Sequence, residues 1–210
     1  MTNLVEVIVD MVEQPGTKLL VEIGAHDDQD ALELARHFKQ VHSHYEFVKI
    51  PERREGNLDI KKVPYLDVLK QLEQYDVILL KNEFHHFPDI WQMWTYEKLS
   101  PRQELLLVEW DFSGTNNHYY SSFQNCRPLC ELTREVLGRF VDAGIVTIEA
   151  QTKGKYEEVF PTCEALIDYY HFLLPDHWKF GEKMLFSKIA GAEYPVPIWE
   201  GFDLFKIGKL

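Results

Sequence analysis

Apolar runs of strand length alternate with segments of helical spacing along most of the chain. Continuous apolar runs, typical of strands buried on both faces, occupy residues 75–80 and 104–110. Further strands are predicted at 18–23, 45–50, 145–150 and 201–207, and helices at 4–12, 28–41, 89–99, 129–141, 163–174 and 182–190. Residues 63–68 fit either a short helix or a short strand, whereas 52–62 and 111–125 are polar and predict loops.

This alternation predicts one α/β domain over residues 1–210, built as a three-layer α/β/α sandwich. The sheet is expected to be doubly wound and mainly parallel. No crossover of standard length separates the last two predicted strands, so the final strand is expected to be antiparallel.

The first predicted strand ends in Glu22-Ile23-Gly24, and a helical pattern starts almost at once. In a doubly wound sheet this turn lies at the carboxyl edge, where ligands bind, and the N–H groups of the following helix favour an anion. A cofactor is therefore expected here first, although three acidic residues follow Gly24 within six positions.

Composition narrows the choice of partners. The formal net charge is −12, which opposes binding to phosphate backbones, so nucleic acid is not expected as a partner. The three cysteines show neither a disulfide framework nor a cysteine-rich zinc pattern. No apolar segment approaches the ~20 residues needed to cross a bilayer, so a cytoplasmic protein without a membrane segment is expected.

Four pieces, in order, resemble the class I S-adenosylmethionine-dependent methyltransferases. They are Val21-Glu-Ile-Gly-Ala25, Tyr75-Asp-Val-Ile-Leu79 followed by Asn82-Glu-Phe-His-His-Phe-Pro-Asp89, Leu99-Ser-Pro101 with Leu105-Leu-Leu-Val-Glu109, and Gly201-Phe-Asp-Leu-Phe-Lys-Ile207. The resemblance implies a methyltransferase-like Rossmann fold, S-adenosylmethionine as cofactor, and a small molecule or protein as methyl acceptor. It implies cofactor contacts from the first turn, the acidic residue after strand two and the segment after strand four, namely Glu22, Gly24, Ala25, His26, Glu52 (or Glu46), Asn82 and Glu83. No catalytic residue is identified.

Two departures from the family pattern leave the activity open. His26 and Asp28 stand where the family has its second and third glycines, which allow a ligand to approach the backbone closely. Only 51 residues separate Gly24 from Tyr75, so one strand or helix is expected to be missing. An alternative is therefore a methyltransferase fold that has lost its cofactor and serves as a binding module.

Other candidates for chemistry are weaker. The Ala25-His-Asp-Asp28 turn also resembles that of zinc-dependent deacetylases, which gives a metal-dependent hydrolase as a second alternative. Adjacent His85 and His86 are expected to diverge, one packed and one exposed, so no metal site is predicted there. Aromatic residues after the 104–110 strand are expected either to hold a substrate or to fill the pocket, namely Trp110, Phe112, His118, Tyr119, Tyr120 and Phe123.

Overall fold

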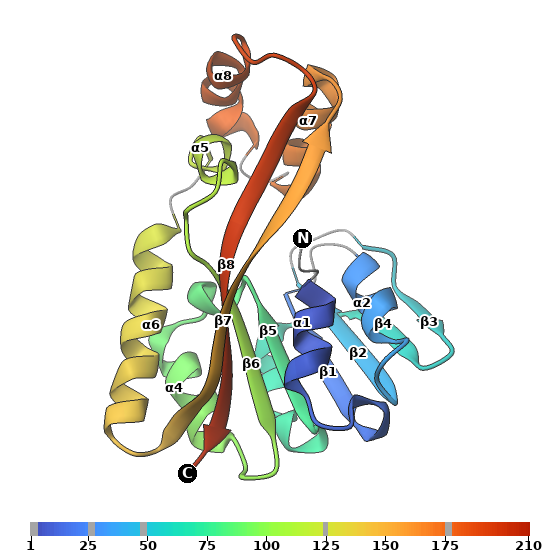
Figure 1. Cartoon of the computed structure of the whole chain (residues 1–210), viewed down its shortest axis with the longest axis vertical. Coiled ribbons are helices and arrows are strands. Elements are labelled where there is room, and N and C mark those ends of the chain that lie inside the picture. The colour runs from blue at the N-terminus through green and yellow to red at the C-terminus, as the bar shows by residue number, and fades with distance from the viewer. Residues whose placement is uncertain (1–3, 25–27, 47–49, 124–125, 175–177) are drawn as a thin grey trace.

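The computed structural model describes residues 4–24, 28–46, 50–123, 126–174 and 178–210 (Figure 1). Within them, eight strands form one sheet in the order β3-β4-β2-β1-β5-β6-β8-β7. The strands are β1 (Leu19–Ile23), β2 (Gln40–Tyr45), β3 (Arg53–Glu55), β4 (Leu58–Lys62), β5 (Val77–Lys81), β6 (Glu104–Trp110), β7 (Val146–Phe160) and β8 (Val196–Lys209). The five central strands β4, β2, β1, β5 and β6 are parallel, whereas β8 runs antiparallel to both β6 and β7. The expected antiparallel last strand is confirmed.

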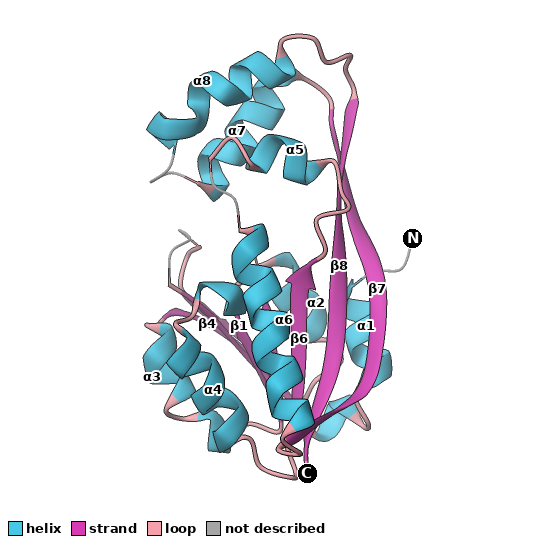
Figure 2. Ribbon diagram, turned by 90° about the vertical axis from the view of Figure 1, so that its left-hand side faces the viewer, coloured by secondary structure: helices cyan, strands magenta, loops and turns pink. Residues whose placement is uncertain are grey.

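Helices cover both faces of this sheet (Figure 2). On one face lie α1 (Leu4–Met11) and α2 (Gln29–Leu34), and on the other α3 (Tyr65–Leu69), α4 (Asp89–Lys98) and α6 (Arg127–Asp142). Consecutive residues of a strand pack into the cores on opposite faces of the sheet. Leu20 and Leu79 pack with α1 and α2, whereas Val21 and Ile78 pack with the helices of the second face. This is why the central strands are continuously apolar, as the three-layer prediction requires.

A small distal lobe extends beyond the sheet. Strands β7 and β8 continue past the end of β6 as a two-stranded ribbon that carries α5 (Asn116–Tyr120), α7 (Cys163–Leu173) and α8 (Trp178–Ile189) (Figures 1 and 2). A third apolar core holds these elements together, with Tyr170, Leu166 and Leu185 fully buried. Part of the predicted loop 111–125 is thus the short helix α5.

The second strand was predicted in the wrong place. Strand β2 occupies Gln40–Tyr45, and α2 ends at Leu34 rather than continuing to residue 41. Three polar residues, His42, Ser43 and His44, follow one another in this strand, so it lacks the apolar pattern by which strands are predicted. The strand forms because it pairs with β1 on one side and β4 on the other. Of the predicted strand 45–50, residues 47–49 lie outside the described residues.

Residues 52–62 are a β-hairpin rather than a loop. Strand β3 runs back antiparallel to β4, and β4 joins the sheet parallel to β2, so β3 takes the place of the helix that usually makes such a crossover. Gly56 turns the chain at φ 57°, and Asn57 Nδ2 donates to the carbonyl oxygens of Ala35 and Phe38, each at 2.8 Å. The element expected to be missing before Tyr75 is thus a crossover helix, since the described residues between β2 and β4 include no helix. The open segment 63–68 belongs to a helix, α3.

Among the described residues, no helix has the length and apolar character needed to cross a bilayer.

Candidate functional site

Glu22, the residue before the last of β1, lies in a buried ionic network. Its carboxylate is fully buried, accepts a hydrogen bond from Ser43 Oγ at 2.7 Å and lies 3.4 Å from Lys81 Nζ. Lys81 Nζ also lies 2.5 Å from Asp30 Oδ2 at the start of α2. Burial raises the pKa of Glu22, while Lys81 and Ser43 act in the opposite direction. Glu22 therefore links β1 to β2 and β5 across the carboxyl edge.

Gly24 has a conformation that only glycine adopts readily. Its φ is 95°, and a Cβ there would lie 2.3 Å from the Lys81 carbonyl oxygen and 2.6 Å from Glu83 Cγ. The buried Glu83 side chain thus packs against the glycine where the family resemblance places the cofactor. Burial, with the charges of Glu109 and Glu46, raises the pKa of Glu83 to about 8.

Asn82 follows β5 directly and stands in the sequence between Lys81 and Glu83, the two residues close to Gly24. It is 4% exposed, has φ 53°, and its N–H donates to the Val108 carbonyl oxygen at 2.9 Å. Its Oδ1 has no hydrogen-bond partner among the described residues. A buried acceptor without a donor costs about 1–3 kcal/mol, so this amide is the clearest unsatisfied polar group of the edge.

Glu46, not Glu52, follows the second strand. Because β2 ends at Tyr45, Glu46 stands at its carboxyl end, where its Oε2 accepts the N–H of Tyr65 at 2.9 Å. Glu52 lies beside the β3–β4 hairpin, where its Oε1 accepts the N–H of Lys62 at 3.0 Å. Glu52 therefore does not directly follow the second strand, which is the place on which its choice over Glu46 rested.

Ala25 and His26 lie outside the described residues, as does Asp27. Asp28 precedes α2 at the N-cap position, but its side chain makes no capping hydrogen bond. It pairs instead with Arg53 of β3, Oδ2 to Nη2 at 2.7 Å. The β3 hairpin thus draws the carboxylate away from the helix terminus that capping would have used.

A second group of ionisable side chains lies around the segment that follows β5. His85 belongs to the short 3-10 helix η3 (Phe84–His86), and its Nδ1 lies 2.7 Å from Glu109 Oε2 of β6. Glu109 is fully buried and also accepts the His85 N–H through Oε1 at 3.1 Å, while the Cys130 thiol contacts Oε2 at 3.5 Å. His85 Nε2 is buried and has no hydrogen-bond partner among the described residues.

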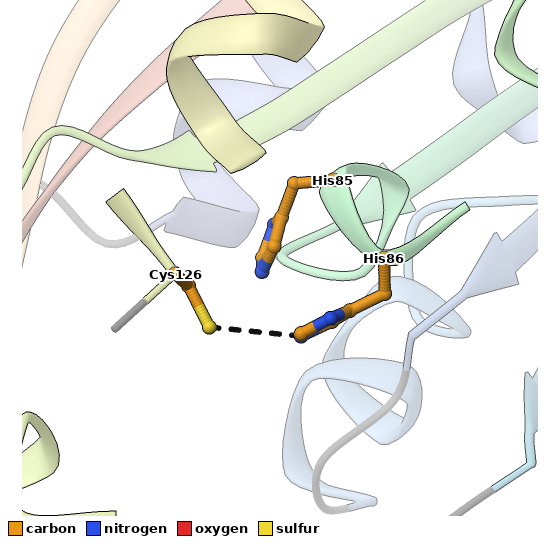
Figure 3. A group of neighbouring side chains, drawn as sticks. All are labelled: His85, His86 and Cys126. Carbon is orange, nitrogen blue, oxygen red and sulfur yellow. Dashed lines mark hydrogen bonds between the residues drawn. The ribbon is translucent and has the colours of Figure 1, made fainter. Parts of the chain in front are cut away.

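His86 is exposed, whereas His85 is buried, so the predicted contrast between them holds. Their rings nevertheless converge, with centroids 4.1 Å apart, and His86 Nε2 lies 3.9 Å from the sulfur of Cys126 at the start of α6 (Figure 3). Cys126 and Glu109 are not predicted from the sequence as partners of this pair, because nothing in their spacing connects them with it.

The aromatic residues after β6 fill space rather than line a large pocket. Trp110 and Tyr120 are buried with ring centroids 4.8 Å apart, and the adjacent cavity of about 10 Å³ has room for about one water molecule. Glu200 borders this cavity, and burial raises the pKa of its carboxyl to about 8. Of the two interpretations left open, the structure favours the filled pocket.

Solved structures of low sequence identity share the architecture. A proposed methyltransferase from Bacillus halodurans matches 98% of this chain and 98% of its own, with 14% identity and a TM-score of 0.55. A proposed type II methyltransferase from Anaeromyxobacter dehalogenans matches 98% of this chain and 94% of its own, with 15% identity and a TM-score of 0.56. The YcgJ protein from Bacillus subtilis matches 97% of this chain and 95% of its own, with 12% identity and a TM-score of 0.51.

No protein-family model matches the chain, and no curated protein sequence does. At identities of 12% to 15%, the structural likeness establishes the fold, which is that of the class I methyltransferases. The predicted fold class is confirmed.

Proposed function

We propose that the protein is an S-adenosylmethionine-dependent methyltransferase that acts on a small molecule or a protein. The observation that carries the proposal is the buried Oδ1 of Asn82, which has no hydrogen-bond partner among the described residues. Asn82 follows β5 directly, between Lys81 and Glu83, which both lie close to Gly24. Ligands of doubly wound sheets bind at this edge. An acceptor that the described residues leave unsatisfied is what a ligand with N–H donors would complete.

Other residues at this carboxyl edge of the sheet are of kinds that suit S-adenosylmethionine. Gly24 supplies a turn without a side chain, and Glu46 stands at the end of β2, the position the family uses for the ribose hydroxyls. The carboxylate of Glu46 favours a cationic sulfonium centre. When bound, the cofactor supplies the methyl group. The chain's own residues would hold it, orient the acceptor and exclude water.

One contact favours a second candidate, a methyltransferase fold that has lost the cofactor and serves as a binding module. Glu83 Cγ lies 2.6 Å from where a Cβ of Gly24 would be, so protein already fills the space beside the glycine. For the cofactor to bind there, Glu83 must turn away from Gly24. A silent protein would keep this contact.

The zinc-dependent hydrolase finds no comparable support. His26 and Asp27 lie outside the described residues, and the carboxylate of Asp28 is paired with Arg53.

Calorimetric titration with S-adenosylmethionine and S-adenosylhomocysteine separates the two candidates. The enzyme is expected to bind both, and Asn82→Gly, which suits φ 53° and removes the amide, should weaken binding about 5- to 10-fold. Glu55→Ala, an exposed change on the β3 hairpin, serves as the control and should leave affinity unchanged. No heat and no thermal shift at millimolar cofactor would make the enzyme proposal wrong. Binding that appears only in Glu83→Ala would show that the natural protein has lost the cofactor, as the second candidate requires.

A further inference from the structure

Three potential metal ligands from two distant segments meet at the end of β5. They are His85 and His86 of η3 and Cys126 at the start of α6, and their side chains point toward a common space (Figure 3). We propose that they bind a divalent transition-metal ion, with zinc the ion best suited to two imidazoles and a thiolate. This inference does not depend on whether S-adenosylmethionine binds.

The spacing of the ligand atoms suits a single ion. The nitrogen and sulfur atoms of the three residues lie within 4.8 Å of one another. A tetrahedral zinc site, with Zn–N of about 2.0–2.1 Å and Zn–S of about 2.3 Å, places N and S about 3.6 Å apart. The 3.9 Å between Cys126 Sγ and His86 Nε2 exceeds this by a few tenths of an ångström, which small side-chain rotations supply.

His85 is prepared as a ligand by the residue behind it. Its Nδ1 faces the fully buried carboxylate of Glu109 at 2.7 Å, so the proton belongs on Nδ1 and the lone pair on Nε2. That Nε2 is buried and has no partner among the described residues. A carboxylate that orients a histidine in this way is the usual support of a metal-bound imidazole. An imidazole packed only for its shape would leave this nitrogen unsatisfied at a cost.

A cysteine–histidine nucleophile pair explains the cluster less well. Such a pair needs only Cys126 and His86, and it leaves unexplained the buried His85 Nε2, which has no hydrogen-bond partner among the described residues. The neighbouring group of His85, Glu109 and Cys130 is fully buried, and its members already hydrogen-bond to one another. It therefore supports the site rather than holding an ion itself.

Binding requires no electron transfer. The ion accepts lone pairs from the two imidazole nitrogens and from the Cys126 sulfur, whose thiol proton is released to water. His86 is exposed, which gives the ion a path from solvent. Three protein ligands leave a fourth position for water or a substrate atom, as in catalytic rather than structural zinc sites. The ligands themselves lie close to the carboxyl ends of two strands, because His85 follows β5 and contacts Glu109 near the end of β6.

Metal analysis of the full chain, purified under reducing conditions without chelator, tests the proposal together with a Co²⁺ titration. We expect one equivalent of bound metal and a thiolate-to-Co²⁺ charge-transfer band. His86→Ala, a change at an exposed position that should not disturb folding, should weaken Co²⁺ binding at least 10-fold. Cys126→Ser should abolish the charge-transfer band.

Matched controls come from residues of the same kinds elsewhere in the chain. Cys163→Ser removes a partly exposed thiol, and His37→Ala an exposed imidazole, and both should bind Co²⁺ as the wild type does. A wild-type protein without a charge-transfer band, or with an affinity that His86→Ala leaves unchanged, would overturn the proposal. So would a band that disappears in Cys163→Ser instead of Cys126→Ser.

Discussion

The side chain of Glu83 packs against Gly24, where a Cβ would lie 2.6 Å from Glu83 Cγ. The end of β5 therefore approaches the turn after β1 so closely that the protein itself requires a glycine. From the sequence alone, this glycine is explained by a ligand that approaches the backbone. In the structure the glycine is also required because Lys81 and Glu83 leave no space for a Cβ. A glycine required by packing affects the stability of the fold when it is replaced, whereas one required only by a ligand affects binding.

Gly24→Ala is expected to reduce the free energy of unfolding by about 3 kcal/mol or more. An alanine pays roughly 1–2 kcal/mol for a left-handed backbone and must also displace the Lys81 carbonyl oxygen, 2.3 Å from its Cβ. Gly56→Ala is the matched control, because Gly56 also has positive φ but nothing lies within 4 Å of its Cβ, so about 1 kcal/mol is expected. Urea denaturation measures both. Equal losses would show that Glu83 and Lys81 do not confine the turn.

Lys81→Met should destabilise the fold by about 3–5 kcal/mol, because it leaves the fully buried Glu22 without its cation. Adding Glu22→Gln should recover part of this loss, with a coupling of about 1–3 kcal/mol in a double-mutant cycle. Lys70→Met, which removes the exposed pair with Asp67, should change stability by no more than about 0.5 kcal/mol. Additive effects of the Lys81 and Glu22 changes would contradict the network.

The free energy of unfolding should fall as pH rises from about 5 to 8, because the buried Glu83 keeps its proton in the folded protein. Its pKa is about 8 in the folded protein against 4.5 in the reference state, so the folded state binds the extra proton in this interval. The stabilisation is complete below pH 4.5 and is lost as pH rises through 8, at about 1.4 kcal/mol per pH unit.

Glu83→Gln should remove this dependence in urea titrations at pH 5.5, 6.5 and 7.5. Glu200→Gln, in the distal lobe, should remove a separate dependence of the same sign, since the pKa of Glu200 is also raised to about 8. Glu55→Gln on the exposed hairpin should leave the slope of the wild type. A slope unaffected by Glu83→Gln would mean that Glu83 is ionised in its contact with Gly24.

The sequence predicts the elements whose burial is uniform and misses those decided by their partners. Strands β1, β5 and β6 lie within two residues of the predicted bounds, because each is apolar on both faces. Four of the six residues of strand β2 are polar, and the β3–β4 hairpin is highly charged. Both exist because neighbouring strands pair with them.

The site divides in the same way. Glu22 lies near the end of a predicted strand, and Gly24, Asn82 and Glu83 follow predicted strands, so their meeting at one edge follows from the topology. The cluster of His85, His86 and Cys126 does not, because about 40 residues separate Cys126 from the histidines. Only the packing of α6 beside η3 brings them together.

Glu109→Gln should weaken Co²⁺ binding 10- to 100-fold while keeping the charge-transfer band of Cys126. Glu109 accepts both the backbone N–H and the Nδ1–H of His85, one with each carboxylate oxygen. A glutamine has only one oxygen. If its amide N–H faces Nδ1, the proton moves to Nε2, which then has no lone pair for the ion.

Cys130→Ala is the control for this prediction. It removes another contact of Glu109 Oε2, at 3.5 Å, without changing the acceptor that faces His85. We expect its Co²⁺ affinity to stay within about threefold of the wild type, well below the effect of a lost supporting carboxylate. Equal weakening in both variants would mean that the change disturbs the buried packing around β6. In that case the tautomer of His85 would not be what prepares this side chain to bind an ion.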